Sequence, residues 1–155
     1  MPDLVGSKLS VSSTRPILYF SYGANMATEA MATRCPEARL LGPALLDGHA
    51  FLINARHFAT ITPAAGKQVH GVLWLLTADD RHALDEYEGI AIGLYRRHTV
   101  RVETPDGRHE EALAYMAGDR TPTRTRDEYL DHIVRAAREH GFPDDYLAEL
   151  EAWRA

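Results

Sequence analysis

The sequence has little of several features that mark common protein classes. It contains one cysteine, Cys35, which cannot form a disulfide within the chain and gives no support to an oxidising compartment. No apolar run approaches the length of about 18 residues that a membrane-spanning helix needs. Residues 1–16 also lack the hydrophobic core of a signal peptide. These absences predict a soluble cytoplasmic protein without a membrane partner.

Basic residues are too few for a typical nucleic-acid-binding protein. The 155 residues include 17 Lys and Arg against 22 Asp and Glu, a formal net charge of −5. Proteins that bind nucleic acids usually gather a basic excess on one face, whereas the basic clusters here, such as Arg96-Arg97, are short. We therefore expect no nucleic-acid partner. The 45% hydrophobic and 25% charged residues are ordinary for one globular domain of this length.

The common catalytic and cofactor motifs are missing as well. There is no Walker or dinucleotide-binding glycine pattern and no G-x-S-x-G elbow. His109-Glu110 begins like a zinc protease motif, but Leu113 stands where the second histidine would be needed. The remaining histidines show no close metal-ligand spacing. The sequence therefore predicts neither a cofactor nor a metal.

The hydrophobic patterning predicts an α+β fold in one domain, residues 16–155, behind a flexible leader over residues 1–15. We expect strands over residues 17–22, 69–76, 95–103 and 108–116, and several short strands within 38–62. We expect turns at residues 64–67 and 104–107. Helices are expected over residues 26–34, with Asn25 as N-cap, over 77–87, and in two C-terminal segments separated by Gly141.

Two segments carry residues suited to chemistry. In Tyr19-Phe20-Ser21-Tyr22-Gly23-Ala24-Asn25-Met26, a strand turns at glycine into a helix whose free N–H groups could hold a carboxylate. A simple strand-to-helix turn is the alternative. Leu84-Asp85-Glu86-Tyr87-Glu88-Gly89-Ile90 places three carboxylates at a helix end, against the helix dipole. Glu86 and Glu88 lie about 200° apart on a helix, so at most one faces a given pocket. A solvated acidic patch is the alternative here.

Four ordered blocks resemble the gamma-glutamylcyclotransferase family. They are Tyr19–Met26, similar to its Y-G-S-N turn, His70-Gly71-Val72-Leu73-Trp74, Leu84–Ile90, and Gly93-Leu94-Tyr95. The tail Glu139–Tyr146 is also similar. The resemblance implies a small mixed β-barrel with helices around it: one after the first strand, one before the central hairpin and two at the C-terminus. It also implies an enzyme that releases 5-oxoproline from a gamma-glutamyl amide, with a small-molecule gamma-glutamyl partner.

The resemblance further implies the site residues. Glu88, immediately before Gly89, corresponds to the catalytic acid-base carboxylate of the family. The residues that would bind substrate are Tyr22, Gly23, Ala24, Asn25, Tyr95 and Tyr129. We expect the pKa of Glu88 to be raised by desolvation, with help from Asp85 or Glu86.

Two departures from the family leave alternatives open. Ala24 replaces the usual serine, and residues 54–67 are shorter than in the animal enzymes. The sequence therefore does not identify the leaving amine, which could belong to a gamma-glutamyl-amine or a biosynthetic intermediate. A module that binds a gamma-glutamyl ligand without turning it over is a further alternative, and a homodimer is left open.

Overall fold

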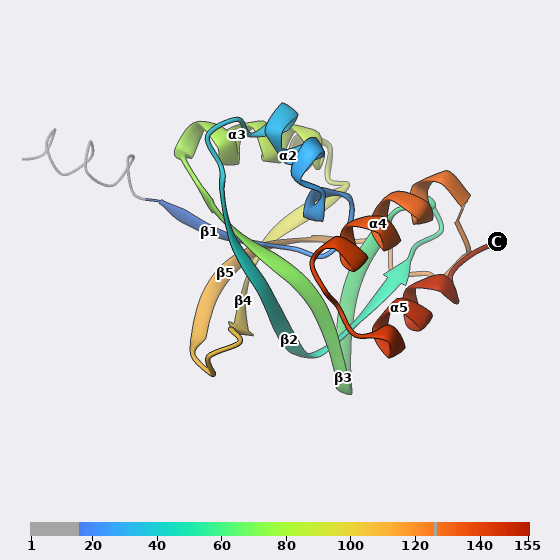
Figure 1. Cartoon of the computed structure of the whole chain (residues 1–155). Helices are drawn as coiled ribbons and strands as arrows, with labels where there is room; N and C mark the ends of the chain where they lie inside the picture. The colour runs from blue at the N-terminus through green and yellow to red at the C-terminus, as the bar shows by residue number, and fades with distance from the viewer. Residues whose placement is uncertain (1–15, 126) are drawn as a thin grey trace, which may run out of the picture.

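A closed five-stranded barrel with the strand order β1-β3-β2-β4-β5 organises the computed structural model (Figure 1). The structure describes residues 16–125 and 127–155, so the predicted leader over residues 1–15 lies outside the described residues. The strands are β1 Ile17–Ser21, β2 Arg39–Ile53, β3 Ala59–Leu76, β4 Tyr95–Glu103 and β5 His109–Ala117. The helices are α2 Thr28–Arg34, α3 Ala78–Tyr87, α4 Asp127–Glu139 and α5 Asp144–Glu151, with short 3-10 helices η1 Ala24–Met26 and η2 Ile90–Ile92. This confirms the α+β barrel with its inserted and C-terminal helices.

Two of the strands are much longer than the sequence suggested. β2 and β3 pair antiparallel along nearly their whole lengths, so the expected set of short strands within residues 38–62 is wrong. The expected turn at residues 64–67 is also wrong. The pairing moves from Asp47↔Gln68 to His49↔Pro63, which leaves residues 64–67 as a bulge opposite Gly48. Gly48 and Gly66, which both have positive φ, therefore mark a bulge within two continuous strands and not a turn between separate strands. A bulge, like a turn, can require a residue with positive φ.

The segment after β1 differs from the expected helix. Residues 24–26 form the 3-10 helix η1, and α2 begins only at Thr28 behind Ala27, which makes no side-chain cap. Asn25 is therefore not an N-cap. Its side chain is buried and is hydrogen-bonded to Tyr19 and Arg34, so it is not available to the start of a helix.

Helix α3 confirms the predicted start and end. Thr77 and Asp80 form a capping box, in which each side chain accepts a hydrogen bond from the other residue's N–H. The helix ends at Tyr87, with Glu88 as C-cap and Gly89 in the left-handed region at φ 68°. A side chain at residue 89 would be strained by this φ and would meet Leu94. This ending fixes where the Glu88 carboxylate leaves the helix.

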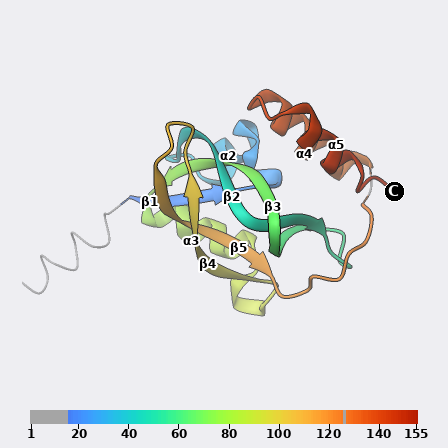
Figure 2. The ribbon, with the colours of Figure 1, turned by 90° about the horizontal axis from the view of Figure 1, so that it is seen from below.

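The C-terminal helices cover one side of the barrel, where both views show them together (Figures 1 and 2). The predicted apolar face of α4 is buried in the main core, with Leu130, Ile133 and Ala137 fully covered. Helices α2 and α3 lie at one end of the barrel (Figure 1). His140, after α4, contacts the carbonyl of Met26 at 2.7 Å through Nε2, which ties this helix to η1.

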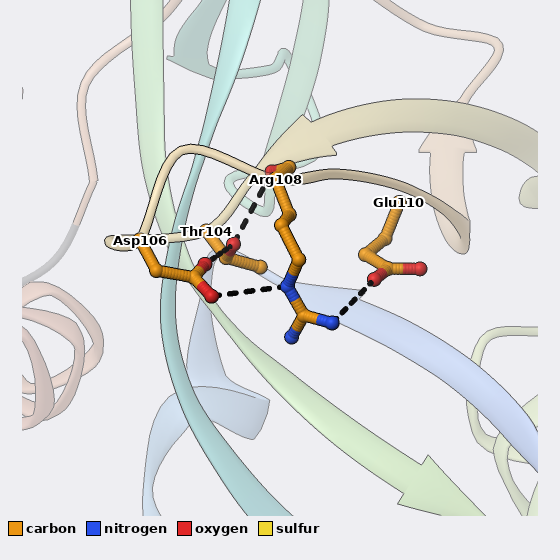
Figure 3. Close-up of polar contacts among 4 residues, drawn as sticks. All are labelled: Thr104, Asp106, Arg108 and Glu110. Carbon is orange, nitrogen blue, oxygen red and sulfur yellow. Dashed lines mark hydrogen bonds and ion pairs between the residues drawn. The ribbon is translucent and has the colours of Figure 1, made fainter.

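The predicted hairpin between β4 and β5 is confirmed, and a polar cluster holds its tip (Figure 3). The Thr104 hydroxyl donates to the Asp106 carboxylate, and Arg108 Nε donates to the same carboxylate at 3.0 Å. Glu110 lies 3.8 Å from the other side of the Arg108 guanidinium. This charged tip is exposed and joins β4 to β5.

Candidate functional site

A cavity of about 210 Å³ lies where β1, β3, β4, β5, the end of α3 and the start of α4 meet. All seven residues predicted for the site line it: Tyr22, Gly23, Ala24, Asn25, Glu88, Tyr95 and Tyr129. The other lining residues are Tyr19, Phe58, Ala59, Tyr87, Leu94 and Tyr115. Among these described residues Glu88 is the sole charged side chain, so the cavity offers one ionisable acid in apolar and phenolic surroundings.

The turn after β1 presents backbone donors to this cavity. Within the described part of the chain, the N–H groups of Gly23, Ala24 and Asn25 donate no hydrogen bond to a backbone or side-chain acceptor. The carbonyl of Asn25 accepts from Trp74 Nε1 at 3.1 Å and from the Ser21 hydroxyl at 3.2 Å, which fixes the turn from behind. Alanine in place of serine at position 24 removes a hydroxyl group and leaves the backbone N–H of this position unchanged.

Glu88 has the electrostatics of an acid-base group. Burial raises its pKa from 4.5 to about 7, and the positive charge of Arg34 opposes that rise. The expected help from Asp85 or Glu86 is absent. Asp85 accepts a hydrogen bond from the Tyr115 hydroxyl at 2.6 Å and lies 3.8 Å from Arg97, while Glu86 is exposed and outside the cavity. Desolvation is therefore the cause that raises the pKa.

Six of the seven tyrosines of the chain line the cavity. Three of them already donate their hydroxyl protons within the protein: Tyr22 to the carbonyl of Tyr115 at 2.5 Å, Tyr95 to the carbonyl of Ala59 at 2.6 Å, and Tyr115 to Asp85. Tyr19 and Tyr129 instead accept, from Asn25 Nδ2 at 3.2 Å and from the N–H of Ala59 at 2.9 Å. Their own protons are thus available to a bound molecule.

Burial also keeps these phenols neutral. It raises the pKa of Tyr129 to about 12 and raises the pKa of Tyr19, Tyr22, Tyr95 and Tyr115 well above the usual 10. Neutral hydroxyls can donate as well as accept hydrogen bonds. The wall of the cavity therefore offers uncharged polar contacts around a single carboxyl group.

The mouth of the cavity carries apolar surface. Phe58 is 44% exposed and Tyr87 is 49% exposed. Phe58 packs edge-on against Tyr129, with ring centroids 6.0 Å apart. The turn that presents it is fixed by Asn54, whose side-chain oxygen accepts from the N–H groups of Arg56 and Phe58. The segment after residue 54 thus forms an aromatic edge to the pocket.

Sequence reasoning did not identify Tyr19, Tyr115, Tyr87, Phe58 and Arg34 as site residues. Tyr19 and Tyr87 each lie within one of the blocks that resemble the family, so their closeness in sequence to Tyr22 and Glu88 is a usable signal. Tyr115 gives a weaker signal, since it is one of several residues in a strand in which side chains point alternately to the two faces. Phe58 and Arg34 reach the site only through the fold.

Other kinds of site find no support in the described residues. Among them, no group of three or more His, Cys, Asp or Glu side chains could hold a metal ion. No helix of the described chain is long and apolar enough to cross a membrane.

Comparisons with known proteins give the family. The chain is 29% identical over 147 residues to mouse (Mus musculus) gamma-glutamylcyclotransferase, covering 87% of this chain and 77% of the relative. It is 29% identical over 145 residues to the human (Homo sapiens) protein of that name, with the same coverage. A solved structure of a gamma-glutamyl cyclotransferase matches with a TM-score of 0.85 at 28% identity, over 90% of this chain and 89% of that one.

A model of the AIG2-like family matches residues 68–150, more than half of the chain. That range includes Glu88, Tyr95 and Tyr129, while the turn at Tyr22–Asn25 lies before it. The resemblance seen in the sequence blocks is thereby confirmed, and the chain belongs to the AIG2-like family.

Proposed function

We propose that the protein is a cyclotransferase that releases 5-oxoproline from a gamma-glutamyl amide, with Glu88 as its general acid and base. One observation carries this proposal: a single carboxyl group with a pKa of about 7 lines a cavity rich in phenols, together with a turn whose N–H groups donate no hydrogen bond among the described residues. The similarity to gamma-glutamylcyclotransferases supports it.

In this reaction the substrate supplies its own nucleophile. The α-amine nitrogen attacks the γ-carbonyl carbon, a five-membered ring forms, and the bond from that carbon to the leaving amine breaks. Because the two reacting groups belong to one molecule, holding them in the reactive pose can supply up to about 7–11 kcal/mol. Such a mechanism needs a positioned pocket and a proton carrier.

Glu88 carries the proton between the two nitrogens. It takes one from the α-ammonium group, whose ordinary pKa is about 8, and returns it to the leaving nitrogen as the carbon–nitrogen bond breaks. The ring nitrogen then loses its second proton to the Glu88 carboxylate, which passes it to the departing amine. With a carboxyl pKa of 4.5 the first transfer would be uphill by about 5 kcal/mol. With a pKa of about 7 the cost falls to about 1.4 kcal/mol.

The turn and the tyrosines would hold the rest of the substrate. The N–H groups of Gly23, Ala24 and Asn25 suit a carboxylate or the oxyanion that forms on the γ-carbonyl. The free hydroxyl protons of Tyr19 and Tyr129 suit the other substrate oxygens. The oxygens of Tyr22 and Tyr95, whose protons are already donated, suit the α-ammonium group.

The test is 5-oxoproline release from a panel of gamma-glutamyl dipeptides, gamma-glutamyl-amines and glutathione, followed by mass spectrometry. Glu88→Gln is run beside the wild type as the control against contaminating activity. Release by the wild type alone supports the proposal. Binding by calorimetry without release would mean a binding module instead, and neither binding nor release across the panel would overturn the assignment.

A further inference from the structure

Arg34 stands outside every role assigned so far, although it contacts two parts of the site. It is the last residue of α2, a helix that the sequence gave no reason to connect with chemistry. It is half-buried and does not line the cavity. Its guanidinium group therefore lies behind residues that line the cavity rather than among them.

The first contact of Arg34 is with the turn that follows β1. Its Nη1 donates to the Oδ1 atom of Asn25 at 2.5 Å. Asn25 is 4% exposed, and its Nδ2 donates in turn to the Tyr19 hydroxyl. A charge-assisted hydrogen bond to a buried amide is strong and directional. Arg34 therefore fixes the side chain of Asn25 and, through it, the hydroxyl group of Tyr19.

The second contact is with the end of α3. The guanidinium carbon lies 3.8 Å from the centroid of the Tyr87 ring, in the geometry of a cation–π interaction. Tyr87 directly precedes Glu88 in the sequence. Stacking on Tyr87 therefore helps to fix the backbone from which the Glu88 side chain extends. The two contacts belong to two separate segments of the cavity lining and meet in one side chain.

These contacts also keep Arg34 away from Glu88. Within the described residues no ion pair of 4.0 Å or less joins the two. A direct arginine–carboxylate pair lowers a carboxyl pKa by roughly 1–3 and would keep Glu88 ionised. Held by Asn25 and Tyr87, the guanidinium acts on the carboxylate only through its field.

We propose that Arg34 is a positioning residue, which joins the Gly23–Asn25 turn to the Tyr87–Glu88 end of α3 and holds its positive charge at a fixed separation from the carboxylate. The catalytic part of this role rests on the proposed function. The contacts with Asn25 and Tyr87 do not depend on it.

The surroundings of Glu88 make its protonation a clean readout of Arg34. Besides Arg34 on α2, the titratable groups that interact with the carboxylate are all phenols. They come from β1, the turn, α3, β4, β5 and α4: Tyr19, Tyr22, Tyr87, Tyr95, Tyr115 and Tyr129. These phenols are neutral near pH 7, so Arg34 is the one cation among the described residues that lowers the pKa of Glu88.

The experiment compares Arg34→Met and Arg34→Lys with the wild type. Arg34→Met removes the charge and both contacts, so the acid limb of the pH profile of kcat/KM moves up by roughly 0.5–1 pH unit. Arg34→Lys restores the charge without the planar guanidinium. The acid limb therefore returns toward the wild-type position, whereas KM is higher than in the wild type because the contacts of the guanidinium with Asn25 and Tyr87 are lost. Arg97→Met is the matched control, since it removes a nearby arginine whose charge does not act on Glu88. Its acid limb stays where the wild type has it.

A second readout does not require activity. The Glu88 side-chain carboxyl carbon is titrated by ¹³C NMR, with Glu88→Gln used to assign the signal. Its midpoint rises in Arg34→Met and not in Arg97→Met. An unchanged midpoint in a folded Arg34→Met protein would overturn the role of Arg34. If 5-oxoproline release fails while the midpoint still moves, the proposed function is lost and the positioning role stands.

Discussion

Glu88 and Asp106 are two carboxylates with an arginine nearby, placed in opposite regions of the molecule. At the exposed hairpin tip, the Thr104 hydroxyl and Arg108 contact Asp106 directly and hold its pKa below the usual value (Figure 3). At the cavity, Arg34 makes no ion pair with Glu88, and burial raises the pKa of the Glu88 carboxyl group to about 7. An arginine close by therefore says little about a carboxylate. What decides its chemistry is whether the two groups touch and whether water remains.

The largest effect should come from removing the buried carboxylate. We expect Glu88→Gln to lower kcat for 5-oxoproline release by about 10²–10⁴-fold, the usual contribution of a general acid-base group. Glu86→Gln and Asp106→Asn, on exposed carboxylates, should leave kcat within about twofold. Steady-state kinetics checks this, with circular dichroism to show that each variant is folded. Equal losses in Glu88→Gln and Glu86→Gln would mean that the acid was wrongly chosen.

The two carboxylates should also give opposite dependences of stability on pH. The folded-state pKa of Glu88 is raised, so its contribution is fully present below pH 4.5 and is lost as pH rises through about 7. Glu88→Gln should therefore gain up to about 3 kcal/mol in unfolding free energy relative to wild type between pH 4.5 and 8. Urea unfolding across this range measures it. A difference independent of pH would refute the raised pKa.

The aromatic side chains at the mouth of the cavity are about half exposed, so their burial is intermediate between that of Glu88 and that of Asp106. Phe58→Ala removes part of its aromatic edge. We expect kcat/KM for gamma-glutamyl-benzylamine to fall about five- to tenfold, since losing about 1–1.4 kcal/mol of apolar contact is reasonable for a half-exposed ring. The value for gamma-glutamyl-methylamine should stay within about twofold. Competition between the two substrates checks it, and equal losses would show that Phe58 supports the fold rather than the leaving group.

The smallest effect belongs to the hairpin tip. Asp106→Asn should change the unfolding free energy at pH 7 only slightly, because exposed ion pairs contribute little. Its effect should run opposite to that of Glu88, since a lowered pKa contributes stability that is lost as pH falls through it. Thermal unfolding at pH 7 and pH 3 measures both. A large loss at pH 7 would mean that the tip nucleates the β4–β5 pairing.

The sequence predicted best what depends on neighbouring residues. The capping box at Thr77, the end of α3 at Glu88 and the turn at residues 104–107 follow from local hydrogen bonding, and each is present. The bulge at residues 64–67 was misread because glycine marks bends and turns alike. Local sequence patterns do not show whether the same strand continues after a glycine-containing segment or a new strand begins.

The candidate site shows the same division. Glu88 and the Tyr22–Asn25 turn could be found through a resemblance in ordered blocks, and their roles stay predictions. The local pattern predicts Asn25 as an N-cap because helix formers follow it, whereas its contacts with Tyr19 and Arg34 in the folded chain decide what its side chain does. Arg34 gave no signal, since its two contacts join segments that only the closed barrel brings together.

Barrel closure has a consequence for how the protein folds. Parallel strands β1 and β5 meet at a single pair, Tyr19 with Leu113, and β2 meets β4 at Leu45 with Glu103. Such pairings between distant segments bear the entropy of closing long loops, so we expect them to form late in folding. Tyr19 belongs both to this seam and to the cavity wall. We expect Glu88 to keep an ordinary pKa until the seam closes, because the burial that raises its pKa exists only in the assembled cavity.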